Sequence, residues 1–236
     1  MHNPQIKLAV FDIAGTTVKD KGNVANAFMQ AFNKHGYSIP GTEVHTLMGY
    51  KKTEAIKIML EKYFPGAISS SRNLVAKIHE TFTAGMISFY ETDPSLEPMP
   101  DAEYVFSQLQ SRDIKVALNT GFGSLITEVI LKRLGWNRTQ LIDFVISSDE
   151  VKYGRPHPLM IQAAMKALHI EHASQVVKIG DTEVDIAEGR NAGCGLVVAV
   201  TTGAYTKEQL LPFQPDAIIG QLKEILTILK TAAVAN

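Results

Sequence analysis

Four short blocks of the sequence combine acidic, hydroxyl-bearing and glycine residues in a way that suits phosphate chemistry. They read Asp12-Ile13-Ala14-Gly15-Thr16, Asn119-Thr120-Gly121, Gly154-Arg155-Pro156-His157-Pro158 and Gly180-Asp181-Thr182-Glu183-Val184-Asp185. Asp12 and Asp181 could share a hard cation such as Mg²⁺ through carboxylate oxygens. The Thr120 hydroxyl, the Gly121 backbone N–H and the Arg155 guanidinium are donors that suit a phosphoryl dianion. The sequence therefore predicts a site for a phosphoryl group and a metal ion.

Each block stands at the end of, or near, a short apolar run that is typical of a buried strand. These runs are Ile6–Phe11, Ile114–Leu118, Phe144–Ile146, Val176–Ile179, Leu196–Val200 and Ala217–Ile219. Helix-length segments such as Ala102–Arg112 and Leu125–Leu134 lie between them. In the second segment, five apolar residues recur at helical spacing: Leu125, Ile126, Val129, Ile130 and Leu134.

Strands that alternate with helices predict an α/β fold, with a Rossmann-like, doubly wound parallel sheet covered on both faces. In such a sheet ligands collect at the carboxyl ends of the strands. We therefore expect the four blocks to meet in one cleft.

One long region breaks the alternation. Between about Val24 and Tyr90 there are only helical patterns, with two apolar stripes: Ala27, Phe28, Ala31 and Phe32, then Ile56, Met59, Leu60 and Tyr63. A block of this length is not a loop inside a compact domain. We predict an all-helical cap domain, residues 19–95, inserted into a core domain made of residues 1–18 and 96–236. Its tethers would be Lys19–Asn23 and the proline-rich Thr92–Pro100.

The order and spacing of the blocks resemble the haloacid dehalogenase superfamily of phosphohydrolases, and the resemblance covers essentially the whole chain. It implies that Asp12 is the nucleophile and also a ligand of Mg²⁺. The backbone carbonyl of Ala14 and the carboxylate of Asp181 would complete the protein ligands, and Asp185 would hold a metal-bound water. A carboxylate can accept a phosphoryl group, giving an acyl phosphate that water later cleaves.

The same resemblance assigns the residues that face the phosphoryl group. Thr120 and Gly121 would hold its oxygens. Arg155 would take the place of the superfamily's usual lysine and would join the nucleophile and the phosphoryl group electrostatically.

Position 14 departs from the superfamily pattern. Most members carry a second aspartate there, which acts as general acid and base, and alanine cannot donate a proton to a leaving alkoxide. Ala14 with Arg155 resembles the phosphonoacetaldehyde hydrolase (phosphonatase) branch, which cleaves a carbon–phosphorus bond. In that branch a cap lysine forms an imine with the substrate aldehyde, so no acid is required at this position.

Lys52 matches the position of that lysine, because Met48-Gly49-Tyr50-Lys51-Lys52 resembles the branch's cap motif. The helical pattern gives an independent argument: Lys52 lies four residues before Ile56, on the apolar stripe, whereas Lys51 would pair with Glu54 on another face. A partly desolvated lysine favours its neutral, nucleophilic form. The alternative is that Lys52 only extends its ammonium from the edge of the stripe into solvent.

Two further positions differ from the phosphonatase. The cap histidine three residues after the lysine is Ala55 here, and the residue after Thr120-Gly121 is Phe122 where the phosphonatase has tyrosine. A proton shuttle would have to be water or another group such as His157. The chain therefore resembles a phosphonatase-like sister group.

Composition restricts the partners. The formal net charge of −1 excludes the broad basic field that binds nucleic acid. The single cysteine, Cys194, excludes an internal disulfide framework and a cysteine-rich zinc site. No apolar run reaches membrane-spanning length, and the N-terminus carries no signal-peptide pattern, so we expect a cytoplasmic protein without membrane partners. The resemblance is compatible with a cap-to-cap homodimer, although no motif indicates the oligomeric state.

Three functions are compared on these grounds. The first is a Mg²⁺-dependent hydrolase of a small 2-oxoalkyl phosphonate such as phosphonoacetaldehyde, with an aspartyl-phosphate on Asp12 and an imine on Lys52. The alternative is a phosphatase of small phosphate monoesters, of the phosphoglycolate or sugar-phosphate type, with the same nucleophile; Ala14 argues against it. The third is a phosphate-binding or regulatory protein without turnover, which would not need the nucleophile.

Overall fold

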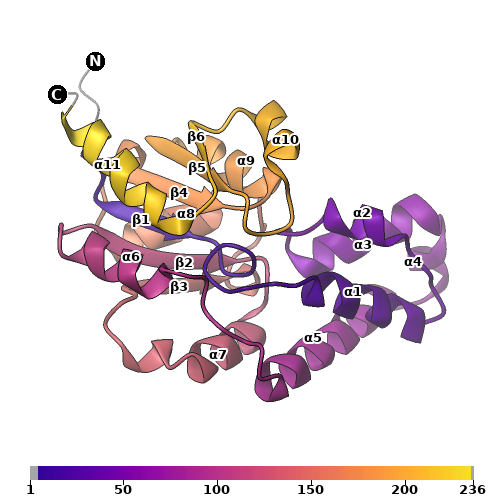
Figure 1. Ribbon diagram of the computed structural model, residues 1–236. Coiled ribbons are helices and arrows are strands. Elements are labelled where there is room, and N and C mark those ends of the chain that lie inside the picture. Colours follow the sequence, from indigo (N-terminus) through magenta and orange to yellow (C-terminus); the bar gives the residue numbers. More distant parts are fainter. Residues whose placement is uncertain (1–4, 235–236) are drawn as a thin grey trace.

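A parallel six-stranded sheet forms the centre of the molecule in the computed structural model, which describes residues 5–234 (Figure 1). The strand order is β3-β2-β1-β4-β5-β6, and all neighbouring strands are parallel. The strands are β1 (Leu8–Phe11), β2 (Lys115–Thr120), β3 (Phe144–Ser147), β4 (Val176–Gly180), β5 (Leu196–Val200) and β6 (Ala217–Ile219). Each predicted apolar run is therefore a strand, and the predicted doubly wound α/β core is confirmed.

Side chains that alternate along β1 reach opposite faces of the sheet, as the strand period requires. Leu8 and Val10 pack in a cluster with residues of α8 (Leu159–Ala167). Phe11 faces the other way, where its ring lies edge-on to Phe106 of α6 (Ala102–Gln110) at 5.3 Å between ring centres. Because both faces are covered, β1 is apolar throughout rather than alternating.

The remaining helices complete this core. They are α7 (Ser124–Arg133), α9 (Glu183–Ala192), α10 (Lys207–Leu210) and α11 (Ile225–Val234). Short 3-10 turns span Trp136–Arg138, Ser148–Glu150, Ala173–Gln175, Leu211–Phe213 and Leu222–Glu224. Among the described residues, no helix is both long enough and apolar enough to cross a bilayer.

The stripe predicted on α7 is partly wrong. Ile126 and Ile130 are buried, but Leu125 is 60% exposed. Thr127 is buried in its place, with its hydroxyl bonded to the Gly123 carbonyl at 3.1 Å. The buried face of α7 is therefore turned by about one residue from the predicted one.

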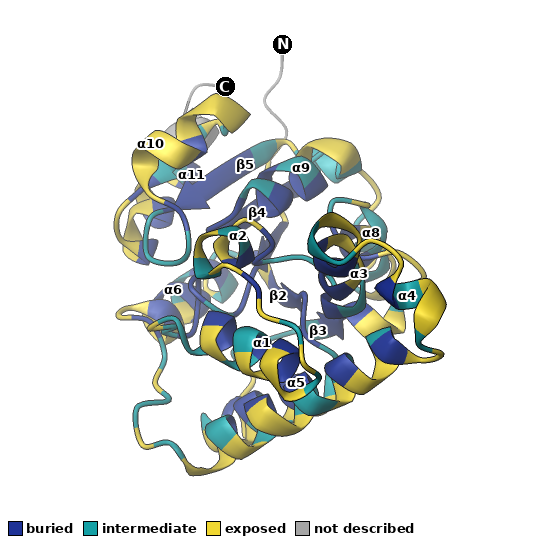
Figure 2. Cartoon of the chain, turned by 90° about the vertical axis from the view of Figure 1, so that its right-hand side faces the viewer, coloured by how far each residue is buried: buried dark blue, intermediate teal, exposed yellow. Residues whose placement is uncertain are grey.

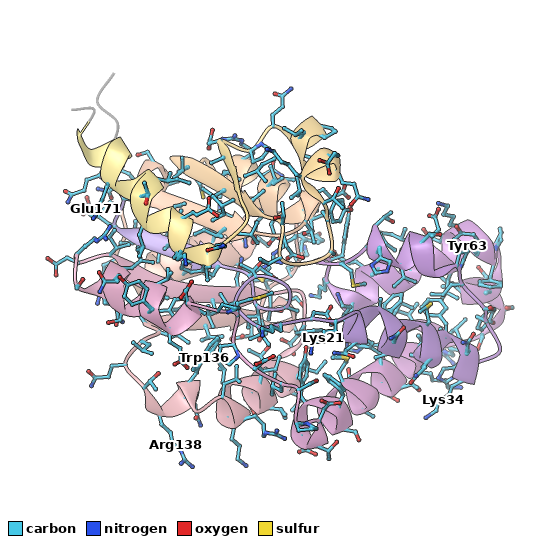
Figure 3. All side chains as sticks on the ribbon, viewed as in Figure 1. Lys21, Lys34, Tyr63, Trp136, Arg138 and Glu171 are labelled. Carbon is cyan, nitrogen blue, oxygen red and sulfur yellow. The ribbon has the colours of Figure 1, made fainter. Side chains whose placement is uncertain are left out.

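The only tryptophan and the only cysteine of the sequence, Trp136 and Cys194, are both packed in the core domain. The indole N–H of Trp136 donates to Glu103 at 2.7 Å, and its ring lies 5.6 Å from that of Phe106 (Figure 3). Cys194 packs beside two apolar clusters of the core, and burial raises the pKa of its thiol to about 12. Both side chains are therefore packing residues.

Five helices between β1 and α6 form a separate group beside the sheet (Figure 1). They are α1 (Asn23–Lys34), α2 (Gly41–His45), α3 (Lys52–Tyr63), α4 (Ala67–Ser70) and α5 (Leu74–Thr92). Buried residues lie in stripes on α1, α3 and α5, with exposed residues on their other faces (Figure 2). Phe28 of α1 and Phe82 of α5 meet at 5.9 Å between ring centres. The proposed domain limits at 18/19 and 95/96 remain a prediction, and residues 1–4 and 235–236 of the core domain lie outside the described part.

The two tethers of this cap run side by side. Val18 and Pro98 form an antiparallel bridge, and the Met99 N–H donates to the Thr17 carbonyl at 2.8 Å. Lys19 adds a salt bridge to Glu97 at 2.8 Å. The chain therefore leaves and re-enters the core at one place.

Candidate active site

The loop after β1 turns sharply so that Asp12 and Asp181 lie close together. Gly15 has a φ of +88°, which L-residues with a side chain rarely adopt. A Cβ at Gly15 would lie 2.6 Å from Asp181 Oδ2 and 2.9 Å from the Gly203 Cα. Glycine is therefore required here, both for the turn and for the approach of the Asp181 carboxylate.

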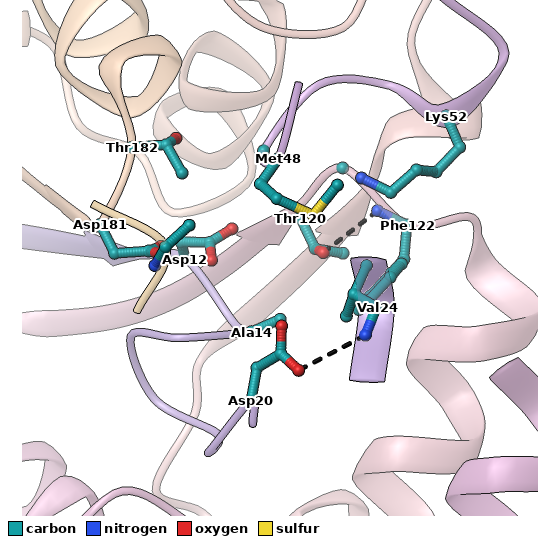
Figure 4. A pocket seen from close by; sticks show the side chains of 13 residues that line it. Asp12, Ala14, Asp20, Val24, Met48, Lys52, Thr120, Phe122, Asp181 and Thr182 are labelled. Atoms are coloured by element: carbon teal, nitrogen blue, oxygen red, sulfur yellow. Dashed lines mark hydrogen bonds between the residues drawn. The ribbon is translucent and has the colours of Figure 1, made fainter. Parts of the chain in front are cut away.

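A pocket lies between the cap and the loops that follow the strands (Figure 4). It holds about 360 Å³ of empty space, including the part open to solvent. The core contributes Asp12, Ala14, Thr120, Gly121, Phe122, Asp181, Thr182 and Ala204. The cap and its first tether contribute Asp20, Val24, Met48, Gly49 and Lys52. Six of the eight predicted site residues thus line one pocket, while Arg155 and Asp185 lie buried behind its wall.

Asp12 and Asp181, two of the carboxylates that line this pocket, lie in a negatively charged environment. Asp181 accepts hydrogen bonds from the Ala204 N–H at 2.7 Å and from the Thr16 hydroxyl at 3.2 Å. Burial raises its pKa well above the usual range, and repulsion from Asp12 and Asp185 raises it further. The pKa of Asp12 is also raised, mainly by burial, although Arg155 acts in the opposite direction.

This donor set fits a magnesium ion. Carboxylate and carbonyl oxygens are the ligands that Mg²⁺ prefers, and it commonly uses one or two carboxylates and several waters. The Ala14 carbonyl accepts none of the backbone hydrogen bonds formed among the described residues, so it is free to bind. No group of three or more His, Cys, Asp and Glu side chains within residues 5–234 is arranged for a metal. The carboxylates of Asp12 and Asp181 with the Ala14 carbonyl are thus a set of oxygen ligands that fits Mg²⁺.

Arg155 lies behind Asp12, fully buried, and its donors are already engaged. Its Nη1 donates to Asp12 Oδ1 at 2.7 Å, and its Nε donates to Glu188 at 3.0 Å. Its Nη2 donates to the carbonyl and side-chain oxygens of Asn119 at 2.8 and 2.7 Å. An ion pair with Asp185 at 2.9 Å completes the set. Arg155 thus contacts the predicted nucleophile, whereas its predicted contact with phosphoryl oxygens would require one of these partners to move.

Asp185 is held by two cations and by Thr182. Its Oδ1 lies 2.9 Å from Arg155 Nη1 and 2.9 Å from Lys178 Nζ, while Oδ2 accepts from the Thr182 hydroxyl at 2.5 Å. Burial alone would raise the pKa of Asp185, but Arg155 and Lys178 outweigh burial and lower it. Because Asp185 does not line the pocket, its predicted hold on a metal-bound water remains a prediction.

Three residues of this buried network were not identified from the sequence. Lys178 donates to Asn119 at 2.8 Å, and Asn119 in turn donates to both oxygens of Glu188 at 3.0 and 2.9 Å. A lysine within the apolar run Val176–Ile179 is a signal that could have been noticed, because charged residues in buried strands need partners. Glu188 lies on a helix face and gives no such signal.

Lys52 points into the pocket from the start of α3 (Figure 4). It is 3% exposed, its Nζ donates to the Tyr50 carbonyl at 3.2 Å, and its Nζ lies 5.6 Å from the centre of the Phe122 ring. Burial lowers its pKa to about 8, and this effect exceeds the opposing attraction of Asp12. The alternative in which Lys52 reaches solvent from the edge of the stripe is therefore wrong.

Lys51 does not pair with Glu54 as predicted. It caps α3 rather than belonging to its first turn, so its side chain reaches the core, where Nζ donates to the Val151 carbonyl at 2.9 Å. Glu54 instead accepts from the Gly154 N–H at 3.4 Å. Both side chains therefore fasten the cap to the loop that precedes Arg155.

The structure also shows the surroundings of Ala55, which stands at the position of the cap histidine, and of His157, the residue suggested as a proton shuttle. Ala55 is fully buried on α3, so no polar group stands at that position. His157 is exposed, its ring lies 5.0 Å from that of Tyr153, and it does not line the pocket. His157 is therefore not a proton shuttle in this arrangement.

Comparisons with known proteins show the family to which the chain belongs. A family model for haloacid dehalogenase-like hydrolases matches residues 6–193. A phosphonoacetaldehyde hydrolase of Bacillus cereus (strain B4264) is 28% identical, over 98% of this chain and 89% of the relative. Another from B. cereus (strain ATCC 14579) is 30% identical, over 80% of this chain and 74% of the relative.

A solved structure shows the same fold over nearly the whole chain. It is a phosphonoacetaldehyde hydrolase-like protein from Oleispira antarctica, with a TM-score of 0.81 and 21% identity, covering 98% of this chain and 93% of its own. The chain is thus a hydrolase that belongs to the haloacid dehalogenase-like family, in its phosphonatase-like branch.

Proposed function

We propose that this enzyme cleaves the carbon–phosphorus bond of a small 2-oxoalkyl phosphonate such as phosphonoacetaldehyde. The observation that carries the proposal is the placement of Lys52, a buried amine with a lowered pKa, in the same small pocket as Asp12. Position 14, where an acid would serve an alkoxide leaving group, holds alanine. A site with an amine and no acid at that position suits a leaving carbon that is activated as an imine.

Lys52 and Asp12 divide the reaction between them. The neutral amine of Lys52 attacks the substrate aldehyde and forms a protonated imine with loss of water. An oxygen of Asp12 then bonds to phosphorus, and the electron pair of the breaking carbon–phosphorus bond moves into the imine to give an enamine. Water later cleaves the aspartyl-phosphate, and hydrolysis of the carbon product from Lys52 restores the enzyme.

The other residues hold and orient the phosphonate. Thr120 and the backbone of Gly121 would bind its oxygens, and Arg155 would keep Asp12 fixed and ionised through its 2.7 Å hydrogen bond. Asp12, Asp181 and the Ala14 carbonyl would hold Mg²⁺. When bound, Mg²⁺ offsets the repulsion between the two anions that approach one another.

Hydrolysis of small phosphate monoesters, of the phosphoglycolate or sugar-phosphate type, remains the alternative. Asp12, Asp181 and Thr120 would serve a phosphate ester equally well, because the roles proposed for them concern the phosphoryl group and the metal and not the leaving group. The two functions differ in their need for Lys52.

The test is a side-by-side assay of phosphonoacetaldehyde and a panel of phosphate monoesters with Mg²⁺. Lys52→Arg keeps the positive charge but removes the primary amine, so we expect carbon–phosphorus cleavage to be lost. Borohydride added with the aldehyde substrate should leave a stable mass adduct on the peptide that contains Lys52. Lys51→Arg is the matched control, because an arginine there can still donate to the Val151 carbonyl.

Full activity of Lys52→Arg, or an adduct on Lys51, would reject the imine mechanism. Turnover of phosphate esters alone would favour the alternative, and no turnover of either class would favour a binding protein. A cytoplasmic location and a homodimer also remain predictions.

A further inference from the structure

One titratable side chain in the pocket wall has no role in the proposed function. The wall carries four such groups: Asp12, Asp181, Lys52 and Asp20. The first is the nucleophile, the second would bind the metal and the third would form the imine. Asp20 comes from the tether between β1 and α1, and its carboxylate reaches the pocket from a different side than Lys52 does (Figure 4).

The Asp20 carboxylate is fixed at the start of α1. Its Oδ1 accepts hydrogen bonds from the Asn23 N–H at 2.8 Å and from the Val24 N–H at 3.4 Å. Both bonds use the same oxygen, so Oδ2 remains available to a molecule in the pocket. The capping bonds therefore orient the carboxylate without occupying it.

Asp20 also interacts electrostatically with Lys52. Burial is the main influence on the Lys52 pKa and lowers it, and the Asp20 carboxylate acts in the opposite direction by favouring the ammonium form. The same carboxylate contributes to the raised pKa of Tyr90, for which burial is the larger cause. Asp20 is therefore close enough to these two groups to affect their proton equilibria.

Imine formation requires proton transfers that the other groups cannot provide. Lys52 must lose a proton before it attacks, and the carbonyl oxygen must leave as water. Asp12 is committed to phosphorus, and both oxygens of Asp181 already accept hydrogen bonds, Oδ1 from the Thr16 hydroxyl and Oδ2 from the Ala204 N–H. Among the residues that line the pocket, Asp20 is the remaining carrier.

We infer that Asp20 is a further catalytic residue, which moves a proton between Lys52 and the oxygen of the substrate aldehyde. The inference rests on the proposed function. The Asp20 carboxylate takes a proton from the Lys52 ammonium, and the freed amine bonds to the carbonyl carbon while the π pair moves to oxygen. Within this adduct one proton passes from nitrogen to oxygen. Protonated Asp20 then gives its proton to the hydroxyl, which leaves as water while the nitrogen lone pair forms the C=N bond. The sum is aldehyde plus ammonium to protonated imine plus water, and Asp20 ends as a carboxylate.

The test compares Asp20→Asn with Asp149→Asn. Asparagine keeps an oxygen for the α1 cap but cannot carry the proton. Asp149 is the matched control because it caps α7, accepting from the Ser124 N–H at 2.9 and 3.0 Å, and does not line the pocket. With phosphonoacetaldehyde, we expect kcat of Asp20→Asn to fall by about 100-fold with little change in KM or Tm. Borohydride trapping of Lys52 should slow by a similar factor, and Asp149→Asn should resemble the wild type in both assays.

The outcomes separate this inference from the proposed function. Wild-type trapping on Lys52 with an unchanged trapping rate in Asp20→Asn would overturn the role of Asp20 and leave the imine mechanism intact. A wild-type enzyme that gives no Lys52 adduct would overturn both. A fall in kcat that is matched by a fall in Tm, with normal trapping, would mark Asp20 as a helix cap only and also overturn the inference.

Discussion

At the scale of single residues, burial gives Lys52 its chemistry. Its ammonium donates to one carbonyl, and the face of Phe122 lies near it. Removing a charged amine from water favours the neutral form, so its pKa falls to about 8. At pH 7 roughly a tenth of the population then has a free amine, far more than a solvated lysine would provide.

A pH dependence follows from this pKa. The rate of borohydride trapping on Lys52 should rise about tenfold per pH unit below pH 8 and level off above it, because only the neutral amine attacks. A solvated lysine would level off only near its ordinary pKa of about 10.4. Trapping rates measured from pH 6 to pH 10 check this, and a rise that continues unbroken to pH 10 would show that Lys52 is not desolvated in solution.

The same pKa predicts an effect on stability. The folded-state pKa of Lys52, about 8, lies below the ordinary lysine value of 10.5, so the unfolded chain binds more protons between these values. The ammonium therefore destabilises the folded protein at pH 7, and this cost is relieved as the pH rises from about 8 to 10.5. Lys52→Met should have a higher Tm than the wild type at pH 7 and a smaller advantage at pH 10. Equal Tm differences at the two pH values would contradict this.

Ala14 gives a prediction about the leaving group. Ala14→Asp places a carboxyl group in the pocket wall near Asp12, where it could donate a proton to a leaving oxygen. We expect that Ala14→Asp does not increase the rate of phosphonate cleavage. It should increase the weak hydrolysis of phosphate monoesters. Assays of both substrate classes on the same preparation check this. Ordinary enzymatic rates on phosphate esters in the wild type would remove the argument from Ala14.

At the scale of elements, the cap is positioned by a close contact between backbones. A Cβ at Gly121 would lie 2.5 Å from the Tyr50 carbonyl oxygen and 2.6 Å from that of Gly49. Both are backbone atoms and cannot yield as a flexible side chain would. The segment that leads into α3, and with it Lys52, therefore seats directly on the loop after β2.

Gly121→Ala should therefore move the cap away from the core. We expect carbon–phosphorus cleavage to fall by about 100-fold, the loss that a displacement of about 1 Å can cause, while far-UV circular dichroism stays unchanged. Gly85→Ala in α5 is the control, because a Cβ there meets nothing within 4 Å, and it should keep full activity. Full activity in Gly121→Ala would show that the cap does not close as described.

The helices and strands also show which features of the fold can be predicted from the sequence. Apolar runs predicted every strand, and apolar stripes predicted the cap helices α1 and α3, because burial imposes those periods. The predicted burial of Leu125 was wrong because the buried face of α7 includes Thr127 instead. The Thr127 hydroxyl can be buried because it donates to the Gly123 carbonyl. The contact of Lys51 with Val151 depends on where the cap rests on the core, and no local pattern contains that information.

At the scale of the whole molecule, the site gathers residues that are distant in the chain because parallel strands end at one edge. Asp12 and Asp181 could be predicted as site residues because each directly follows a strand. Asp20 could not, because its place depends on how the tether returns along the pocket. Arg155 was predicted, but its buried network with Lys178 and Glu188 was not, since these residues come from a loop, a strand and a helix.

The balance of buried charge is a property of this whole assembly. Four buried carboxylates, those of Asp12, Asp181, Asp185 and Glu188, lie together with three buried cations: Arg155 and Lys178, which form ion pairs with them, and Lys52, which lines the same pocket as Asp12 and Asp181. The raised pKa values of Asp12 and Asp181 have burial as their main cause and mutual repulsion as the next contribution for Asp181. A divalent cation beside Asp12 and Asp181 would offset the repulsion between these two carboxylates.

Mg²⁺ should therefore stabilise the folded protein as well as activate it. A ligand that binds only the folded state raises stability by about 2.7 kcal/mol at 100 times its Kd. We expect Tm to rise with added Mg²⁺ in the wild type and to fall after exhaustive chelation. In Asp181→Asn the dependence on Mg²⁺ should be largely lost, while the Tm without metal should increase because a repelling buried charge is removed. Asp12→Asn should abolish turnover and keep the fold. Unchanged turnover and Tm after chelation of the wild type would show that the excess of carboxylates is balanced by protons and not by a metal.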